Sequence, residues 1–473
     1  MKKNHTNSEN MGYVLFLSVV AALGGFLFGY DTAVISGTIK GVSTQFNMND
    51  IQSGWYVGCA LLGSIGGVLI AGRLSDLFGR RPVLFASAVL FSASAIGCML
   101  SPNEQWLVFY RIIGGIGIGV ASVISPLYIS EISVPRYRGR LVSLYQLAIT
   151  VGFLGAYMVN YALKINAQTM QANAILHTSW TSKILVSEVW RSMLGAEVLP
   201  ALLFFITLFF IPESPRWLIV KHKNTQSLRI LSRIQGEETA IAQLKEIKLM
   251  VQHEEQSNWR LLFQHGYRTA MIIGISLAIL GQFMGVNAVL YYGPSIFEQT
   301  GLSEGDSLFY QVFVGLINVI STVIAIWLID RIGRKKLIYY GVAGMLVSLI
   351  LIAMYFQINK TSMVIPPVTL LVLILAYIFG CAISICVVIW VLLSEMYPTK
   401  VRGAAMSLAG FSLWVGTYLI GQLTPWLMNS LSATGLFLLF ALMCLPYLWI
   451  TWKLVPETTG KSLEEIEQMW MTR

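Results

Sequence analysis

The sequence predicts an all-α membrane protein: twelve transmembrane helices in two pseudo-symmetric six-helix bundles, with a small intracellular helical segment. The chain of 473 residues is 56% hydrophobic and only 12% charged, whereas soluble globular proteins carry about 25% charged residues. Long apolar segments recur along the chain, and one polar signature occurs twice. Residues 72–81 read Gly-Arg-Leu-Ser-Asp-Leu-Phe-Gly-Arg-Arg, and residues 327–336 read Trp-Leu-Ile-Asp-Arg-Ile-Gly-Arg-Lys-Lys. This composition excludes an ordinary soluble enzyme.

The apolar segments are each near or above the roughly 20 residues that a helix needs to cross a bilayer. They cover residues 12–37, 52–74, 82–100, 105–130, 140–163, 192–211, 268–298, 308–329, 337–357, 367–394, 403–428 and 433–455. The first segment does not resemble a cleavable signal peptide, because it is too long and carries Asp31 where a cleavage site needs small residues.

The Lys and Arg residues predict the orientation, because cytoplasmic loops of membrane proteins are rich in these residues. With both termini inside, the outer side holds only five of the 32, namely Lys40, Lys164, Lys183, Arg191 and Lys360. Arg111 lies within a span, and all the others fall on the inner side. We therefore expect a multi-pass protein of a cell (inner) membrane with both termini in the cytoplasm. The net charge of +9 then reflects topology and not nucleic-acid binding.

Further motifs repeat in the same order in both halves. The segment Glu131-Ile-Ser-Val-Pro-Arg-Tyr-Arg-Gly139 is echoed by Glu395-Met-Tyr-Pro-Thr-Lys-Val-Arg-Gly403, and Pro212-Glu-Ser-Pro by Pro456-Glu-Thr-Thr-Gly. Two related halves in a membrane chain suggest a transporter whose substrate site lies between them. The predicted division is bundles at 1–212 and 268–455, an intracellular helical linker at 213–267, whose apolar residues recur at helical spacing, and a cytoplasmic tail at 456–473.

No residue pattern predicts a metal site, a cofactor or an enzyme. The five cysteines all lie within apolar segments and form no Cys-x-x-Cys pair, and the five histidines show no ligand spacing. Gly114-Gly-Ile-Gly-Ile-Gly119 superficially resembles a nucleotide loop, but it has no preceding strand. Closely spaced glycines in a spanning helix more often let neighbouring helices approach.

These motifs resemble the major facilitator superfamily and, within it, the sugar porter family. The two Asp-x-x-Gly-Arg signatures carry the first resemblance. The second rests on Pro-Glu-Ser-Pro-Arg-Trp-Leu at 212–218, the Pro-Glu-Thr ending at 456–461, and Gln-Phe-Met-Gly-Val-Asn-Ala-Val-Leu-Tyr-Tyr at 282–292. Residues 27–38 and 110–117 most resemble the bacterial proton symporters of that family.

The resemblance implies the major facilitator fold and secondary active transport by alternating access. The expected substrate is a monosaccharide, pentose or hexose, carried with a proton by a monomer in the lipid bilayer. A sugar or polyol uniporter is the first alternative. A transport-deficient sugar sensor is the second, and the short segment after the last span disfavours it. No function is predicted for the outer loop 164–190.

Three ionisable residues within spans are expected to couple transport to the proton, namely Asp31, Arg111 and Glu197. A carboxylate inside a span costs about 2.5–3.5 kcal/mol on insertion scales and is usually paired or functional. Arg111 is the natural partner of Asp31, and we hypothesise that protonation of Asp31 releases it. The alternative is a static ion pair between the two spans, while Glu197 could simply support packing.

Two further sets of residues follow from motif positions. The expected inner gate comprises Asp76, Arg80, Glu131, Arg138, Asp330, Arg334, Glu395 and Arg402. Charged pairs across the halves could hold that side shut, and the alternative is plain positive-inside topology. The expected sugar site comprises Phe28, Gln146, Gln282, Asn287, Tyr291, Tyr292, Asn318, Trp390 and Trp414, although any one of these amides could instead join helices.

The chain departs from the family pattern at three places. Gly281 replaces a glutamine, Cys386-Val387 replaces a Gly-Pro pair, and Leu413 stands where the family usually has Gln or Asn. Two hydrogen-bonding side chains are lost, so a ligand with a missing or differently placed hydroxyl could fit. The identity of the sugar therefore stays open.

Overall fold

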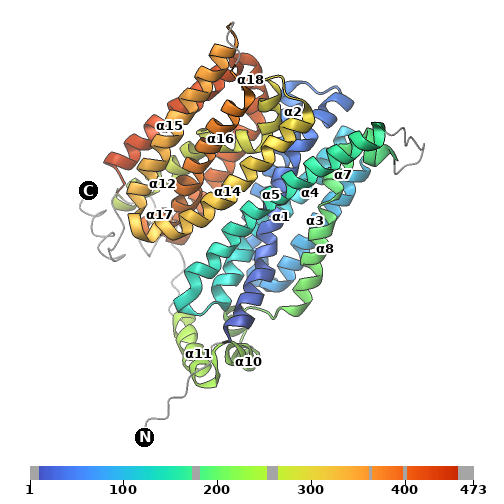
Figure 1. The fold of residues 1–473 in the computed structure, drawn as a ribbon. Helices are drawn as coiled ribbons and strands as arrows, with labels where there is room; N and C mark the ends of the chain where they lie inside the picture. Colours follow the sequence, from blue (N-terminus) through green and yellow to red (C-terminus); the bar gives the residue numbers. More distant parts are fainter. Residues whose placement is uncertain (1–9, 173–181, 253–264, 362–364, 398–401, 456–473) are drawn as a thin grey trace.

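The computed structural model describes residues 10–172, 182–252, 265–361, 365–397 and 402–455, and the described residues fold into long, closely packed helices. Figure 1 shows the first helices, in blue to green, on one side of the molecule and the last, in yellow to red, on the other. The predicted all-helical membrane fold is confirmed. The tail at 456–473 and its family motif lie outside the described residues.

The N-terminal half contains six spans. Five are single helices, and the sixth is built from α7, α8 and a short 3-10 turn, with Glu197 at the junction of α7 and α8. Their bounds are α1 (Met11–Gln45), α2 (Asp50–Phe78), α3 (Arg80–Leu100), α4 (Glu104–Ile132), α5 (Arg138–Ala172), α7 (Val189–Gly195) and α8 (Val198–Thr207).

The C-terminal half has interrupted spans. The seventh span is broken at Gly285, whose φ of +88° favours glycine, and the tenth contains a π-helical turn, η5 (Ala382–Cys386). The helices are α12 (His265–Phe283), α13 (Val286–Glu298), α14 (Glu304–Ile332), α15 (Arg334–Asn359), α16 (Pro367–Cys381), α17 (Val387–Met396) and α18 (Arg402–Lys453).

The last two predicted spans form one continuous element. α18 runs for 52 residues, with a non-helical backbone only at Ser432, where φ is 60°. This residue lies between the predicted spans 403–428 and 433–455. Among the described residues, eleven helices are long and apolar enough to cross a membrane, and because α18 holds two spans, the twelve-span topology agrees with them.

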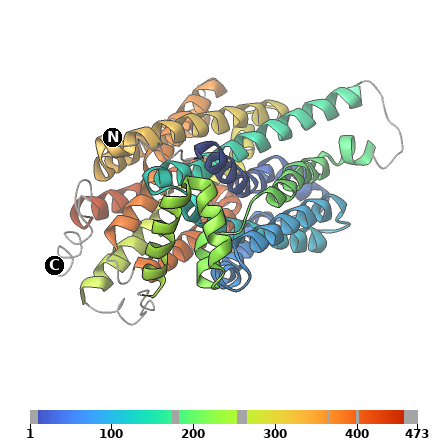
Figure 2. The same cartoon turned by 90° about the horizontal axis from the view of Figure 1, so that it is seen from below.

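Three short helices lie together at one end of the N-terminal half, as the view from below shows (Figure 2). They are α9 (Pro215–Val220), α10 (Asn224–Gln235) and α11 (Glu237–Gln252). We call this end the inner side and the opposite end the outer side. Residues 253–264 of the predicted linker lie outside the described part of the chain.

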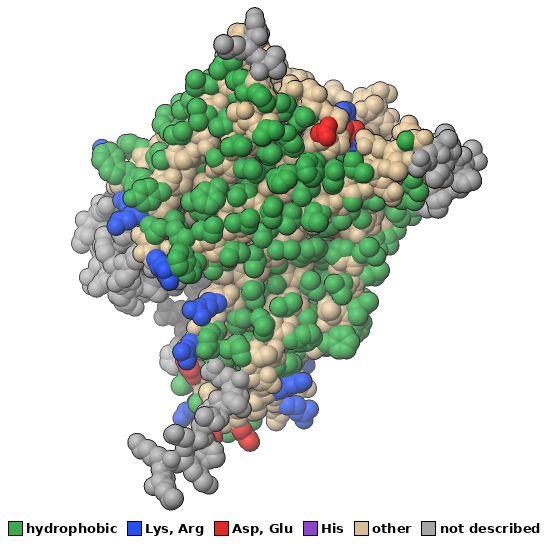
Figure 3. Space-filling view, viewed as in Figure 1, with side chains coloured by type: hydrophobic (Ala, Val, Ile, Leu, Met, Phe, Trp, Pro, Cys, Tyr) green, Lys and Arg blue, Asp and Glu red, His purple; other side chains and the backbone are tan. Residues whose placement is uncertain are grey.

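The exterior is apolar over most of the visible face, with Lys and Arg side chains gathered towards its lower edge (Figure 3). Large hydrophobic side chains such as Leu199, Phe210 and Trp327 are more than half exposed. Helices that are apolar on both their buried and their exposed faces suit a lipid environment.

The glycines of α4 explain its close packing on α2. A Cβ atom at Gly115 would lie 2.0 Å from the backbone oxygen of Ala60, and one at Gly119 would lie 2.2 Å from that of Ser64. Neither position has room for a side chain. The Gly-rich run therefore joins two helices, as the sequence favoured, and does not form a nucleotide loop.

Candidate functional site

A buried ion pair lies within the N-terminal half. Arg111 Nη1 on α4 donates to Asp31 Oδ1 on α1 at 2.6 Å, and the two side chains are only 3% and 1% exposed. Beside the pair, Gly114 lets α3 pack closely on α4, because a Cβ there would lie 2.4 Å from Ser94 Oγ. The structure thus brings together the two residues that the sequence paired.

Glu197 lies close enough to this pair to interact electrostatically with both Asp31 and Arg111. It is 1% exposed. Among the described residues, Asp31 Oδ2, Arg111 Nε and Glu197 Oε1 have no hydrogen-bond partner. The buried guanidinium is therefore bonded to one carboxyl group, and a second carboxyl group, that of Glu197, lies near that one. Such a cluster can hold or release a proton by changing which carboxyl pairs with the guanidinium.

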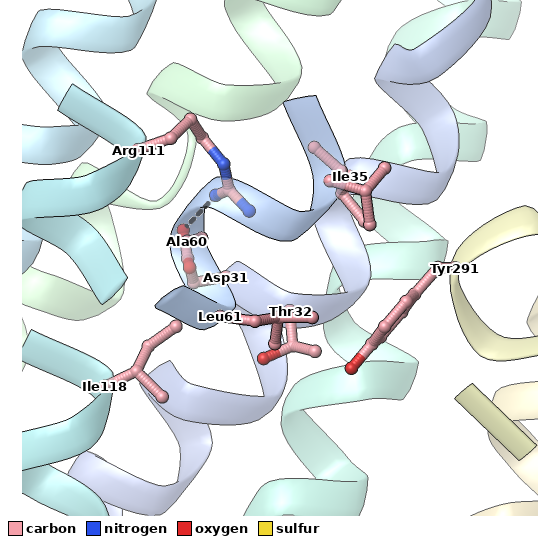
Figure 4. A pocket seen from close by; sticks show the side chains of 9 residues that line it. Asp31, Thr32, Ile35, Ala60, Leu61, Arg111, Ile118 and Tyr291 are labelled. Atoms are coloured by element: carbon pink, nitrogen blue, oxygen red, sulfur yellow. Dashed lines mark hydrogen bonds and ion pairs between the residues drawn. The ribbon is translucent and has the colours of Figure 1, made fainter. Parts of the chain in front are cut away.

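A small cavity connects the ion pair with the other half of the molecule. Its volume is about 10 Å³, enough for roughly one water molecule, and its walls include Asp31, Arg111, Thr32 and Tyr291. Figure 4 shows the Tyr291 ring entering from a separate helix, with its hydroxyl directed towards Thr32. Tyr291 belongs to α13 of the C-terminal half, so the ion pair and one residue of the expected sugar site line the same cavity.

Two of the expected aromatic residues meet between the halves. The rings of Phe28 on α1 and Trp414 on α18 have centroids 5.6 Å apart and planes tilted by 32°. Phe28 is partly buried and Trp414 is 8% exposed. An aromatic face of this kind suits the carbon-bound face of a sugar ring.

Two of the expected amide side chains are hydrogen-bonded to each other, and a threonine hydroxyl also contacts one of them. Asn287 Nδ2 donates to Gln282 Oε1 at 2.7 Å, and Thr417 Oγ1 on α18 donates to the same oxygen at 3.0 Å. Gln282 lies in the last turn of α12 and Asn287 in the first turn of α13, so the break at Gly285 brings these two side chains together. The sequence did not identify Thr417. Its only signal is a polar residue one helical turn after Leu413, the position that lost its amide.

The other expected sugar-site residues have different surroundings. Tyr292 donates its hydroxyl to the backbone oxygen of Gly421 at 2.6 Å, so this hydroxyl joins α13 to α18. Trp390 on α17 is 38% exposed. Gln146 on α5 is partly buried and Asn318 on α14 is buried, and these two helices pack against each other across the halves.

The first signature binds the inner ends of the N-terminal helices to one another. Arg80 forms a two-pronged ion pair with Glu131 on α4, through Nε–Oε2 and Nη2–Oε1 distances of 3.0 Å, and also contacts Asp76 at 3.1 Å. Arg81 donates to the backbone oxygens of Leu208 and Phe209. The ion pairs of Arg80 therefore lie within one half and not between the halves.

Glu213 explains why the signature contains a glycine. Arg80 and Arg81 are the first residues of α3, so their backbone N–H groups have no partner inside the helix. The Glu213 carboxylate accepts hydrogen bonds from both groups at 2.9 to 3.3 Å. Gly79 has a φ of +106°, and a Cβ there would lie 2.3 Å from Glu213 Oε2. Burial raises the pKa of Glu213 even though these amide groups oppose the shift.

The second signature repeats this geometry. Gly333 has a φ of +94°, and Lys335 donates to the backbone oxygens of Trp452 and Val455 at 3.0 Å, as Arg81 does at the end of the sixth span. Arg334 donates to the oxygen of Ile329 at 3.3 Å. Arg138 is exposed. The side chains of Asp330, Glu395 and Arg402 lie outside the described part of the structure.

Polar contacts between the halves gather on the outer side. Lys40 on α1 pairs with Glu298 on α13 at 2.9 Å, and Lys164 on α5 pairs with Glu304 on α14 at 2.8 Å. We call these the outer ion pairs. Both lysines are among the five basic residues that the sequence placed outside, but nothing in the sequence indicated their partners.

Two amides on α18 add to this closure. Gln422 Nε2 donates to the backbone oxygen of Ile51 at 2.9 Å, and Asn429 Nδ2 donates to Asp50 Oδ2 at 2.5 Å. The helices that pack across the halves are α2 with α18, α5 with α14 and α1 with α13.

Comparison with known proteins places this site in a family context. Residues 17–470 match the family model described as "Sugar (and other) transporter". The chain is 39% identical to the arabinose-proton symporter of Bacillus subtilis, covering 98% of this chain and 97% of that protein. It is 37% identical to the D-xylose-proton symporter of Escherichia coli, covering 98% and 96%.

Solved structures show the same similarity. The inward open conformation of the xylose transporter from E. coli matches with a TM-score of 0.83 at 35% identity, covering 97% of this chain and 100% of that one. The same transporter bound to 6-bromo-6-deoxy-D-glucose matches with a TM-score of 0.78 at 36% identity, covering 98% and 100%.

Proposed function

This chain belongs to the sugar transporter family, and from that premise we propose that it carries a monosaccharide across a membrane together with a proton. The observation that carries the proposal is the buried Asp31–Arg111 pair beside Glu197, which is joined by a cavity to Tyr291 of the other half. Arg111 and the two carboxyl groups lie next to the contact between the halves. Protonation of a carboxyl group can therefore change how the two halves are positioned relative to each other.

The proposed coupling follows from the cost of separating buried charges. Removing one partner of a buried pair costs about 3–5 kcal/mol, because the other charge is left uncompensated. Protonation of Asp31 would have this effect on Arg111. Glu197 is then the carboxylate that can form an ion pair with Arg111 in place of Asp31. Any conformation that favours this change of partner gains population.

We further propose that the structure represents an inward-facing state. The outer ion pairs and the bonds of Gln422 and Asn429 join the halves on the outer side. The higher TM-score with the inward open structure than with the sugar-bound one, 0.83 against 0.78, agrees with this assignment. The Arg80–Glu131 pair then stabilises the N-terminal half while the inner gate is open, and the eight gate residues come together only when that gate closes.

The same proposal covers orientation and assembly. The inner side, with α9 to α11, faces the cytoplasm of a bacterial cell, and both termini lie there. The two halves, 1–212 and 268–455, move against each other within a single subunit surrounded by lipid. The positive charge on the inner side supports this orientation.

The substrate is proposed to be a pentose or a hexose. Relatives named for arabinose, xylose and glucose all align over nearly the whole chain. The Phe28–Trp414 contact and the Gln282–Asn287 pair supply an aromatic face and amide groups between the halves, the chemistry that a sugar needs. We retain Gln146, Tyr291, Tyr292, Asn318 and Trp390 as candidates for the remaining contacts.

The test compares the wild type with Asp31→Asn in liposomes, using radiolabelled arabinose, xylose and glucose. We expect the wild type to accumulate one of these sugars when the outside is acidic. Asp31→Asn should still exchange that sugar between equal pools but should not accumulate it. Glu237→Gln, at an exposed carboxylate on α11, serves as the control and should behave like the wild type.

Two outcomes would contradict the proposal. Accumulation by Asp31→Asn would make the ion pair a static link between α1 and α4. Exchange without accumulation in the wild type would identify a uniporter.

A further inference from the structure

The carbonyl oxygen of Gln282 accepts two hydrogen bonds, one from each neighbouring helix. Asn287 Nδ2 lies 2.7 Å away and Thr417 Oγ1 lies 3.0 Å away. Gln282 and Thr417 are buried, at 8% and 5% exposed, and Asn287 is partly buried. A side-chain amide has one acceptor oxygen and one NH₂ group with two donors. Because the oxygen is occupied twice, the NH₂ group of Gln282 is the part left for a ligand.

The Thr417 hydroxyl decides this orientation, because it has one proton and two possible acceptors. Its oxygen also lies 2.9 Å from the backbone oxygen of Leu413. When the proton points to Gln282, the amide oxygen must face Thr417. Were the amide reversed, the hydroxyl proton would point to Leu413 and the hydroxyl oxygen would accept from the amide. Asn287 Nδ2 donates to this oxygen at 2.7 Å, and this bond favours the first arrangement.

The backbone of α18 is shaped to admit Gln282 at this point. A Cβ atom at Gly416 would lie 3.1 Å from Gln282 Cβ and 3.2 Å from its Cγ. A side chain at this position would require Gln282 to shift by a few tenths of an ångström. Within the motifs of the seventh and eleventh spans, Gly281 and Leu413 lack polar side chains. The orientation of Gln282 therefore matters more for sugar binding here than in a site where several amide side chains contact the sugar.

We propose that Thr417 is a positioning residue that sets substrate specificity by fixing the Gln282 amide with its NH₂ group towards the sugar. This inference rests on the proposed sugar transport and deepens it. It predicts a substrate class: sugars that place a hydrogen-bond acceptor, a hydroxyl oxygen or the ring oxygen, against Gln282. Asn287 donates one N–H to Gln282, and its carbonyl oxygen can accept from a neighbouring hydroxyl.

Monodeoxy and monofluoro analogues of glucose distinguish the two amide orientations. Fluorine can accept a weak hydrogen bond but cannot donate one, and hydrogen can do neither. At the sugar position that faces the Gln282 NH₂ group, the fluoro analogue should compete for uptake clearly better than the deoxy analogue. A buried donor left without a partner is costly, so we expect a difference of roughly tenfold or more in the inhibition constant.

The variants are Thr417→Val, which keeps the shape and removes the hydroxyl, and Thr417→Ser, which keeps the hydroxyl. Uptake of labelled D-glucose or D-xylose, whichever the wild type carries, is measured over a range of concentrations. We expect Thr417→Val to raise KM about tenfold, the factor for one lost hydrogen bond of ordinary strength, with little change in the maximal rate. It should also lose the preference for the fluoro analogue, and Thr417→Ser should restore both.

Specific outcomes would overturn the inference. An unchanged KM and analogue pattern in Thr417→Val would show that the hydroxyl does not position the amide. If Thr417→Val does not fold, the analogue pattern of the wild type decides. A donor-facing Gln282 requires at least one sugar position at which the fluoro analogue competes better than the deoxy analogue. If there is no such position, the inference is wrong. Failure of the wild type to carry any sugar would instead contradict the proposed function.

Discussion

The outer ion pairs should stabilise the state in which the outer side is closed. Lys40–Glu298 and Lys164–Glu304 each join the two halves, and both must break when that side opens. We predict that the double variant Lys40→Gln, Lys164→Gln shifts the population towards the outward-facing state. Removing two cations from the outer side leaves the fold of each half intact, because neither pair lies within a half.

The size of the shift follows from the exposure of the pairs. The Lys40 side chain is 54% exposed and that of Glu298 21%, while Lys164 and Glu304 are 21% and 26% exposed. Solvent-exposed pairs contribute about 0.2–1 kcal/mol each, and the more enclosed Lys164 pair belongs near the top of that range. Together they should contribute about 1.2–2 kcal/mol and change the ratio of the two states by roughly 7- to 27-fold, since 1.4 kcal/mol corresponds to a factor of ten.

The assay is a distance measurement between spin labels on the outer ends of the two halves. Labels at Pro102 and Gln357, both exposed, report the opening of that side. Lys183→Gln is the matched control, because Lys183 pairs with Glu188 of its own half at 3.3 Å. The charge swap Lys164→Glu, Glu304→Lys should retain most of the closed population. A distance distribution that the double variant leaves unchanged would refute the reasoning.

Three other substitutions test separate parts of the structure. Gly54→Ala should abolish transport and favour the outward-facing state, because its Cβ would lie 2.0 Å from a backbone oxygen of α18; normal uptake would contradict this. Glu131→Gln should lower the stability of the N-terminal half by about 1–3 kcal/mol, since Arg80 loses a charged partner. Melting in detergent measures it, and an unchanged melting temperature would show that the pair contributes nothing. Asn287→Ala should abolish sugar uptake while the protein remains folded, because Gln282 loses its 2.7 Å donor and the sugar also loses the Asn287 carbonyl oxygen; retained uptake would move the site elsewhere.

Much of the fold could be predicted because the bilayer restricts it so strongly. Apolar length located the spans, and the basic residues gave an orientation. The breaks within spans were harder, since they depend on local backbone geometry. Ser432 interrupts a 52-residue element with a single non-helical residue. The π-helical turn 382–386 lies where the expected Gly-Pro pair is replaced.

Some residues of the candidate site could likewise be predicted from the sequence, and others could not. Asp31 and Arg111 could be paired from sequence, because ionisable residues within spans need partners. Thr417 could not be identified, since Thr322, Thr424 and Thr451 also donate to their own helix four residues back, and only its contact across to Gln282 distinguishes Thr417.

Proton-coupled sugar transport is tested most directly by the external pH of lightly buffered, de-energised cells that express the protein. A panel of pentoses, hexoses and polyols is added one at a time, with Asp31→Asn cells as the reference. The proposed mechanism predicts alkalinisation of the medium for the transported sugar alone, and none in the reference cells. Uptake of labelled sugar by the wild type with no change in external pH would contradict it.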